Sequence, residues 1–367
     1  MNVDLPPTPP EVTIVVPARD EEANLADCLA SLVAQTGVRL EILVVDDHST
    51  DRTGEIARSF AGVRVISPGP LTPGWTGKNN AVVAGAKEAR GVWLLFTDAD
   101  TVHLPGSLAR ALAEAKEHAA ELLSYSPEQI AVTFWELATL PVVFAELARQ
   151  YPPSKVSDPA SPIAAANGQY ILIRRETYEA VGGHAAIASN LLEDVALARA
   201  VKDSGRRIRF RYAANAVRTR MYRNFRQLRE GWTKNLALLF PRPGWLAAGM
   251  MTWWLFSWIA LVLCAASVAA GYWRTTYYAL PAILLYLRIG RGNFSEGTNL
   301  VALGFGPPVF AYLLLLSKNA HMSGGVLWKG RTYGGHAGAG TETSHAQPEV
   351  VRRSSGTGAK STLASRP

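Results

Sequence analysis

An unbroken apolar run at residues 93–96 constrains the fold most, because it ends directly in Thr97-Asp98-Ala99-Asp100. A run that is apolar at every position is typical of a strand buried on both faces of a parallel sheet. Residues i and i+2 of a strand point to the same side, so Asp98 and Asp100 are expected to face one site at the carboxyl end of this strand. Two such carboxylates repel each other unless a cation such as Mg²⁺ or Mn²⁺ lies between them. The alternative is a turn in which an Asp only caps the next segment.

The first hundred residues alternate between short β-branched runs and segments with apolar residues at helical spacing. The expected strands are residues 12–16, 41–45, 63–66 and 93–96, and the expected helices are residues 25–33, residues 53–60 and a segment that begins near Lys78. This alternation predicts the βαβ units of a nucleotide-binding α/β fold with a mainly parallel sheet flanked by helices.

Two further polar segments lie where ligands of such a sheet bind. Asp47, in the string Asp46-Asp47-His48-Ser49-Thr50-Asp51, could accept hydrogen bonds from a base N–H or from ribose hydroxyls, whereas Ser49 or Asp51 could cap the next helix. Lys78 follows Gly77 at a helix start, where free N–H groups and an ammonium group favour a phosphate. The segment is not a P-loop, because the upstream Gly spacing and the Ser or Thr after the Lys are missing.

The net charge of +7 is concentrated in one segment. Residues 206–242 contain eleven Lys or Arg residues and one acidic residue, Glu230, so this segment carries +10 and the rest of the chain about −3 by difference. Because the segment directly precedes an apolar span, an anionic membrane surface or a diphosphate is favoured as its partner over nucleic acid. Cys28 and Cys264 have no metal or redox spacing and are expected to be packing residues.

Three apolar segments near the carboxyl end predict a membrane region of two or three transmembrane segments. Residues 246–270 hold no charge over 25 positions, more than the ~20 that a spanning helix needs. Residues 275–290 are shorter. Residues 298–317 contain Pro307 and Pro308, which favours a broken helix or a re-entrant hairpin there.

The flanking charges predict the orientation of these segments. Arg242 and Arg288 favour an out-and-back pair of crossings that begins and ends in the cytoplasm, and a re-entrant third segment would keep Lys329 and Arg331 on that side. The polar residues 1–10 hold no cleavable signal, so a multi-pass protein of the cell (inner) membrane with a cytoplasmic catalytic domain is expected. The expected division is a flexible N-terminus (1–10), an α/β domain (11–240), a transmembrane region (241–320), a membrane-proximal segment (321–335) and a disordered tail (336–367).

Four ordered motifs resemble those of family 2 inverting glycosyltransferases, which have the GT-A fold. They are Val15-Val16-Pro17-Ala18-Arg19-Asp20-Glu21, Val44-Val45-Asp46-Asp47-His48-Ser49-Thr50-Asp51, Gly77-Lys78-Asn79-Asn80-Ala81 and Thr97-Asp98-Ala99-Asp100. Residues 73–81 and the late Trp328-Lys329-Gly330-Arg331-Thr332-Tyr333 look most similar to a membrane-bound subgroup. That subgroup includes hopene-associated and diaponeurosporenoate (carotenoid) glycosyltransferases.

The resemblance implies the members of a donor site. In the family, the edge of the first strand holds the nucleotide base and ribose, a neighbouring carboxylate reads the base, and an Asp-x-Asp pair binds ribose and Mg²⁺ or Mn²⁺. Arg19 departs from the pattern, since many members have an aromatic residue there. The residues expected to bind the nucleotide sugar are Pro17, Ala18, Arg19, Glu21, Asp47, Lys78, Asp98, Trp232 and Lys234, and those expected to bind the metal are Asp100 and Asp98.

Glu193-Asp194 resembles the family's Glu-Asp motif, whose Asp deprotonates the acceptor hydroxyl. Asp194 is therefore the expected general base, with Glu193 as its catalytic neighbour. The alternative is a helix cap, because a helix start favours charged carboxylates. Trp232 and Lys234 lie where processive relatives have Gln-x-x-Arg-Trp, and the sequence found at residues 227–232 argues against a processive polymer synthase. The alternative for that segment is a surface-lying basic helix.

Together these features predict a membrane-bound inverting glycosyltransferase. It would move a sugar from a nucleotide diphosphate donor, expected to be UDP-linked, to a hydroxyl or carboxyl of a lipid such as a hopanoid or carotenoid. The alternatives are transfer to a polyprenyl phosphate, a non-catalytic nucleotide-sugar-binding membrane protein, and a nucleic-acid-binding protein that uses the Arg-rich segment.

Overall fold

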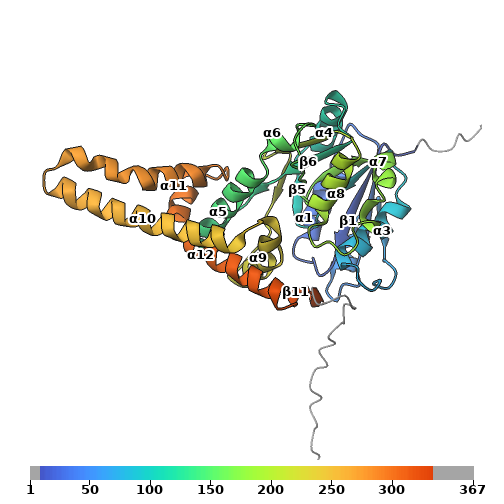
Figure 1. Ribbon diagram of the computed structural model, residues 1–367. Coiled ribbons are helices and arrows are strands. Elements are labelled where there is room, and N and C mark those ends of the chain that lie inside the picture. Colours follow the sequence, from blue (N-terminus) through green and yellow to red (C-terminus); the bar gives the residue numbers. More distant parts are fainter. Residues whose placement is uncertain (1–8, 334–367) are drawn as a thin grey trace, which may run out of the picture.

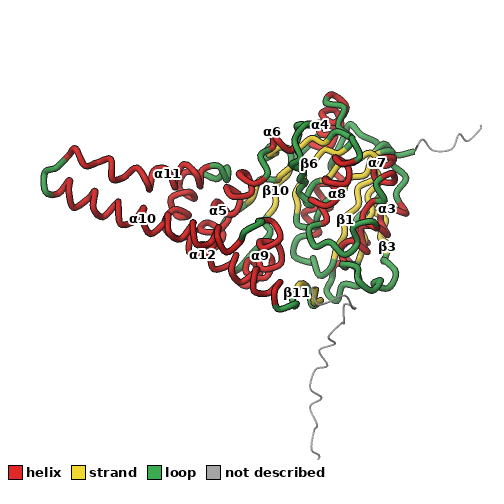
Figure 2. The backbone as a smooth tube through the Cα atoms, viewed as in Figure 1, coloured by secondary structure: helices red, strands yellow, loops and turns green. Residues whose placement is uncertain are grey.

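The computed structural model describes residues 9–333, which form an α/β body and a helical arm that projects from one side of it (Figure 1). Most of the flexible N-terminus expected at residues 1–10, and all of the disordered tail expected at residues 336–367, lie outside the described residues. Strands are confined to the body, and the arm consists of helices and their connections (Figure 2).

A seven-stranded sheet runs through the body in the order β3-β2-β1-β4-β8-β6-β9. All neighbours are parallel except β8, which is antiparallel to both β4 and β6. In that order the strands are β3 (Val63–Ile66), β2 (Leu40–Asp46), β1 (Val12–Ala18), β4 (Trp93–Phe96), β8 (Ile171–Arg174), β6 (Leu122–Ser126) and β9 (Ile208–Tyr212). This sheet confirms the predicted α/β class with mainly parallel strands.

Helices cover both faces of the sheet, which is why β4 at its centre is apolar at every position. The side chain of Ile14 in β1 packs with residues of α1 and α4 on one face, and Val15 packs with residues of α3 and α8 on the other. The helices of the body are α1 (Leu25–Val33), α2 (Thr53–Ser59), α3 (Gly77–Glu88), α4 (Ser107–Glu117), α6 (Pro153–Val156), α7 (Arg175–Ala180), η1 (Gly183–Ala185) and α8 (Glu193–Asp203).

Helix α3 packs against β1 and β2 so closely that position 85 must be glycine. A Cβ atom at Gly85 would lie 2.4 Å from Cγ1 of Val15 and 2.9 Å from Cγ2 of Val45. We expect Gly85→Ala to lower the free energy of unfolding by about 1–3 kcal/mol, because overpacking forces neighbouring atoms to shift. Thermal unfolding of the detergent-solubilised chain measures the effect. Gly69→Ala is the control, since a Cβ atom there meets nothing within 4 Å, and equal unfolding midpoints for the two variants would contradict the close packing.

Two small sheets and a set of longer helices make up the rest of the described chain. One sheet contains β5 (Thr101–His103), β10 (Val217–Thr219) and β7 (Glu128–Gln129), and the other is the hairpin of β11 (Val326–Trp328) and β12 (Arg331–Tyr333). The longer helices and their connections are α5 (Phe134–Gln150), α9 (Phe225–Leu239), α10 (Pro243–Ala269), η2 (Trp273–Ala279), α11 (Leu280–Gly290) and α12 (Glu296–Met322).

Two of the described helices, α10 and α12, are long and apolar enough to cross a membrane. Helix α10 runs outward, and η2 and α11 lead back toward the body (Figure 1). The interruption expected near Pro307 and Pro308 is wrong, because α12 is one continuous helix. Pro308 has no N–H to donate to the carbonyl of Gly304, and the indole Nε1 of Trp254 on α10 donates to that carbonyl instead, at 3.1 Å. A neighbouring helix thus replaces the hydrogen bond that the proline removes.

Helix α5 joins the arm to the body through a buried ion pair. The carboxylate of Glu146 accepts a hydrogen bond from Nε of Arg288 on α11 at 2.7 Å and from Nε of Arg149 at 3.0 Å. Helix α12 approaches α5 so closely that a Cβ atom at Gly306 would lie 2.4 Å from the carbonyl oxygen of Ala138. The base of the arm is therefore packed as part of the body.

Five of the eleven basic residues in residues 206–242 pair with acidic side chains that are distant in sequence. The pairs are Arg206–Glu121, Arg209–Glu114, Arg211–Glu114, Arg218–Glu128 and Arg220–Glu136. For the other basic residues of the segment, an anionic surface or a diphosphate as partner stays a prediction.

Candidate active site

A cavity of about 740 Å³ opens where the carboxyl ends of β1, β2 and β4 lie side by side. Residues of α8, α9 and the β11–β12 hairpin form its other walls. It is lined by every residue that the sequence predicts for the site, namely Pro17, Ala18, Arg19, Glu21, Asp47, Lys78, Asp98, Asp100, Glu193, Asp194, Trp232 and Lys234. Side chains that are more than 200 positions apart in the sequence thus share one cavity.

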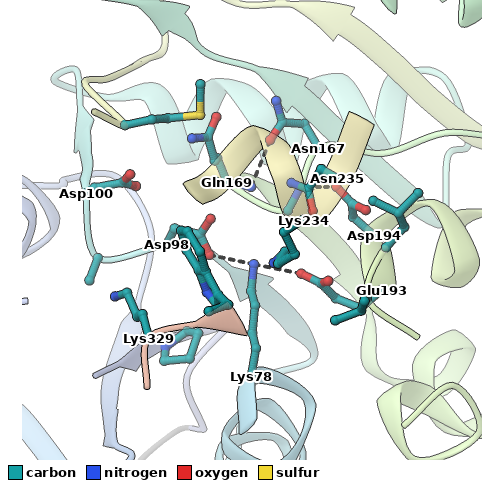
Figure 3. Close-up of a pocket in the computed structure, with 18 of the residues that line it drawn as sticks. Lys78, Asp98, Asp100, Asn167, Gln169, Glu193, Asp194, Lys234, Asn235 and Lys329 are labelled. Atoms are coloured by element: carbon teal, nitrogen blue, oxygen red, sulfur yellow. Dashed lines mark hydrogen bonds and ion pairs between the residues drawn. The ribbon is translucent and has the colours of Figure 1, made fainter. Parts of the chain in front are cut away.

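Lys78 lies between two carboxylates in this cavity (Figure 3). Its Nζ is 2.8 Å from Oδ1 of Asp98 and 2.7 Å from Oε1 of Glu193. Helix α3 positions it, because the hydroxyl of Thr76 caps the helix by accepting a hydrogen bond from the backbone N–H of Asn79. Burial acts to lower the pKa of Lys78, but the two carboxylates outweigh it and hold that pKa well above its ordinary value. The site therefore contains a permanent cation at the start of a helix, which suits a phosphate.

The two adjacent acids at the start of α8 have different surroundings. Burial acts to raise the pKa of Glu193, but the ammonium groups of Lys78 and Lys234 lower it to about 2. Burial and the neighbouring carboxylate of Glu193 raise the pKa of Asp194 to about 6. Asp194 accepts hydrogen bonds from two backbone N–H groups, those of Gly168 at 3.0 Å and Val195 at 2.8 Å. An oriented carboxylate with a pKa near neutrality fits a general base, whereas Glu193 is held in an ion pair.

Asp98 and Asp100 lie in the cavity for a different reason from the one expected. The strand ends at Phe96. Asp98 lies in the irregular backbone directly after it, and Asp100 lies in the turn that comes next. The expected strand alternation is therefore wrong, and the turn alternative correctly describes the backbone. In Figure 3, Asp98 lies toward Lys78 and Asp100 lies on the far side of Asp98 from Glu193.

Asp100 has the properties of a group that needs a cation. Its Oδ1 is buried and has no hydrogen-bond partner among the described residues. Burial, together with the charges of Asp98 and Glu21, raises the pKa of Asp100 to about 7. Within residues 9–333 no group of three or more His, Cys, Asp or Glu side chains is arranged to hold a metal ion. Asp100 and Asp98 fit a divalent cation whose remaining ligands come from a substrate phosphate and water.

The other predicted side chains form the edges of the cavity. Arg19 donates from Nη1 to the carbonyl oxygen of Asp47 at 3.1 Å. Trp232 is buried between Phe144 and Tyr222, with ring centroids 6.2 and 6.0 Å away. Helix α9 packs among other helices through Trp232 and its apolar neighbours, and the arginines on its other face are exposed. The ammonium group of Lys234 lies 5.1 Å from the ring centroid of Trp328.

Two functional candidates were not assigned to the site from the sequence. Arg331 pairs with Asp47, and Lys329 pairs with Glu21, both from the β11–β12 hairpin. A sequence signal for these two cations exists. Lys329-Gly330-Arg331 lies between the aromatic residues Trp328 and Tyr333, shortly after an apolar segment. The sequence predicts a membrane-proximal segment with a motif of the subgroup there, but sequence spacing does not reveal contacts across nearly three hundred residues.

Comparison with known proteins identifies the family. The family model described as "Glycosyl transferase family 2" matches residues 13–182. The chain is 30% identical over 342 residues to "4,4'-diaponeurosporenoate glycosyltransferase" from Staphylococcus aureus (strain MRSA252), and the match covers 88% of each chain. The same enzyme from strain USA300 is also 30% identical, over 343 residues. The chain belongs to glycosyl transferase family 2.

Two solved structures are similar to this glycosyltransferase at low identity. One is mannosyltransferase PcManGT from Pyrobaculum calidifontis in complex with GDP-Man and Mn²⁺, with 16% identity, coverage of 86% of this chain and 88% of that chain, and a TM-score of 0.49. The other is glucosyl-3-phosphoglycerate synthase from Mycobacterium tuberculosis in complex with Mn²⁺, UDP-Glc and glycerol 3-phosphate, with 20% identity, coverage of 62% and 77%, and a TM-score of 0.41.

The body of this glycosyltransferase has the GT-A fold, and its cavity has two chemically different parts. The charged part contains the strand-end carboxylates, Lys78 and the hairpin cations. The apolar part lies toward α5 and α9, and its lining includes Phe144, Leu147, Tyr151 and Leu239. One cavity therefore offers surfaces for a charged substrate and for an apolar substrate.

Proposed function

We propose that this glycosyltransferase moves a sugar from a UDP-linked donor to a hydroxyl or carboxyl group of an apolar lipid, with inversion at the sugar. The division of a single cavity into a charged part and an apolar part carries the proposal. The relatives named diaponeurosporenoate glycosyltransferase support an apolar acceptor, because that name describes a carotenoid acid.

The donor is proposed to bind at the carboxyl ends of β1, β2 and β4. Asp47 would accept a hydrogen bond from the base, and Lys78 would lie beside the diphosphate. Asp100 and Asp98 would hold a divalent cation, Mg²⁺ or Mn²⁺, which would supply Lewis-acid stabilisation of the leaving diphosphate when bound. The unpartnered carboxylate oxygen of Asp100 supports this assignment.

Asp194 is proposed as the general base. Single displacement needs no protein nucleophile, so the chain's task is to take the proton from an acceptor hydroxyl as the hydroxyl oxygen attacks the sugar. The two backbone N–H groups that bind Asp194 orient its carboxylate, and its raised pKa suits proton transfer near neutral pH. The Lys78 ammonium neutralises Glu193 next to it and keeps that second carboxylate from taking the same role.

The helical arm is proposed to hold the enzyme in the cell (inner) membrane, with the body in the cytoplasm. On α10 the side chains of Phe256, Ile259 and Val262 are each more than half exposed, and an apolar surface of this kind is typical of contact with a membrane or a protein. Because α12 packs along α5 and α9, the arm brings the apolar part of the cavity close to the proposed membrane.

Transfer of radiolabel tests the function. The full chain in native membranes or nanodiscs is incubated with radiolabelled UDP-sugars, Mn²⁺ and extracted bacterial lipids. We expect label in an organic-phase product that is stable to mild acid. An acid-labile, phosphate-containing product would identify a polyprenyl phosphate acceptor instead, and nucleotide-sugar binding without any transfer would indicate a non-catalytic protein.

The pH dependence of the reaction tests the base. With a hydroxyl acceptor, kcat/KM is expected to fall below an apparent pKa of about 6, because burial raises the pKa of Asp194 and the base is ionised only above that pH. Initial rates between about pH 5 and pH 8 measure the acidic limb. The residual activity of Asp194→Asn should lack this limb, and a flat wild-type profile over the same range would contradict the assignment.

A further inference from the structure

The β11–β12 hairpin contacts the donor side of the cavity through two cations. Arg331 donates from Nη1 to Oδ2 of Asp47 at 2.5 Å and from Nη2 to Oδ1 at 3.2 Å. Both side chains of this pair are 7% exposed. A buried pair with this two-pronged geometry fixes the planes of both groups relative to each other.

Gly77 at the start of α3 makes room for this pair. A Cβ atom at position 77 would lie 1.8 Å from Nη1 of Arg331 and 3.0 Å from Oδ2 of Asp47. The Gly-Lys dipeptide, which the sequence associates with a phosphate, therefore has a second role. The missing side chain of Gly77 leaves space for the guanidinium of Arg331, while Lys78 pairs with Asp98 and Glu193. Any larger residue at position 77 would displace Arg331 from Asp47.

Lys329 attaches the same hairpin to the edge of β1 and to α9. Its Nζ donates to Oε1 of Glu21 at 2.5 Å and to the carbonyl oxygen of Arg19 at 2.8 Å. Its backbone N–H donates to Oε1 of Glu230 on α9 at 3.3 Å. The hairpin thus bridges the β1 edge, the β2 end, α3 and α9, which are the elements that surround the proposed donor.

We propose that the hairpin is a wall of the donor site and that Arg331 is a positioning residue for the nucleotide base. A carboxylate has about four lone-pair positions. The guanidinium uses two of those on Asp47, and Nδ1 of His48, 3.4 Å from Oδ1, uses a third. The remaining position can accept a ring N–H, and Asp47 lines the cavity. Held in this orientation, Asp47 favours bases that have a ring N–H donor, such as uracil or guanine, over cytosine, whose ring nitrogen is an acceptor.

Binding of nucleotides to the full chain tests this role, which presupposes the donor proposed above. We expect Arg331→Ala to weaken UDP binding and raise the donor KM by about tenfold or more, since an unfixed carboxylate loses a charge-assisted hydrogen bond to the base. The kcat is expected to stay within about threefold. The preference for UDP over CDP should shrink, and Arg331→Lys should recover part of the affinity. Thr332→Ala is the matched control, because Thr332 is exposed on the same hairpin and does not line the cavity.

Two further variants separate this role from damage to the fold. Gly77→Ala keeps both charges but displaces the guanidinium, so it should weaken UDP binding as Arg331→Ala does. In an Asp47→Asn background, Arg331→Ala should cause little additional loss, because the two residues act through one contact. Thermal unfolding midpoints of all variants identify any that do not fold.

The outcomes distinguish the two proposals. Tighter UDP binding by Arg331→Ala would mean that Arg331 blocks the base site, and unchanged binding or an unchanged UDP/CDP preference would mean that it has no part in the site. Either result overturns the role of Arg331 while the proposed function stands. A wild-type chain that binds no nucleoside diphosphate and transfers no sugar would overturn both.

Discussion

Asp194→Asn is expected to reduce kcat with a hydroxyl acceptor by about 10²–10⁴-fold, with donor affinity changed by less than about twofold. The substitution preserves the shape of the side chain but removes the group that takes the proton. One of the two backbone N–H groups that bind Asp194 would lose its acceptor, so the unfolding midpoint should fall modestly as well. Single-turnover transfer of radiolabelled sugar measures the chemical step.

The acceptor itself provides the sharpest control for this variant. A carboxylate acceptor has no proton to lose at neutral pH, so Asp194→Asn should slow its glycosylation far less than that of a hydroxyl acceptor. Asp203→Asn, exposed at the other end of α8, should leave both reactions unchanged. Full turnover of a hydroxyl acceptor by Asp194→Asn would show that another group removes the proton.

Asp100→Asn is expected to weaken Mn²⁺ binding and to reduce metal-supported transfer by about 10²-fold or more, because Lewis-acid stabilisation contributes several kcal/mol. Titration of bound Mn²⁺ by electron paramagnetic resonance, with and without UDP, measures the site independently of activity. Chelation of the wild-type enzyme with EDTA should have the same effect on transfer, and added Mg²⁺ or Mn²⁺ should reverse it.

Stability separates loss of the metal from loss of the fold. Asp100 is buried with one unpartnered oxygen, so removal of its charge should not lower the unfolding midpoint of the metal-free chain. Asp27→Asn on the exposed face of α1 is the control for a surface substitution. Undiminished Mn²⁺ binding in Asp100→Asn would contradict the assignment of this residue.

The strands and their terminal carboxylates could be predicted because each is a local pattern. An apolar run followed by acidic residues identified β2 and β4, and the parallel order of a βαβ chain brought their ends to one edge. The same reasoning misplaced the backbone of Asp98 and Asp100, because a strand's exact end depends on its neighbours. Here the pairing of β4 with β1 and β8 begins at Trp93 and ends at Phe96, and the chain leaves the sheet directly afterwards.

What the sequence did not reveal depends on contacts between distant segments. The Arg-rich segment looked like a free basic surface because Glu114 and Glu136, which neutralise part of it, lie about a hundred residues earlier. The two prolines predict a break in the helix. The indole of Trp254, which replaces the hydrogen bond that Pro308 removes, belongs to a different helix, so the sequence near the prolines does not reveal it. Arg331 was missed for the same reason, since its partner Asp47 is 284 residues away.

The position of Arg331 near the end of the described chain has a consequence for biosynthesis. During translation β1, β2 and α3 emerge from the ribosome early. The apolar helices α10 to α12 follow, and the β11–β12 hairpin that carries Arg331 emerges only after them. A nascent polypeptide that ends near residue 240 lacks the partner of Asp47 and also lacks α12, against which α5 and α9 pack. The proposed nucleotide site is therefore completed last, after translation has passed α10 and α12, and we expect sugar transfer to begin only once these helices have been made.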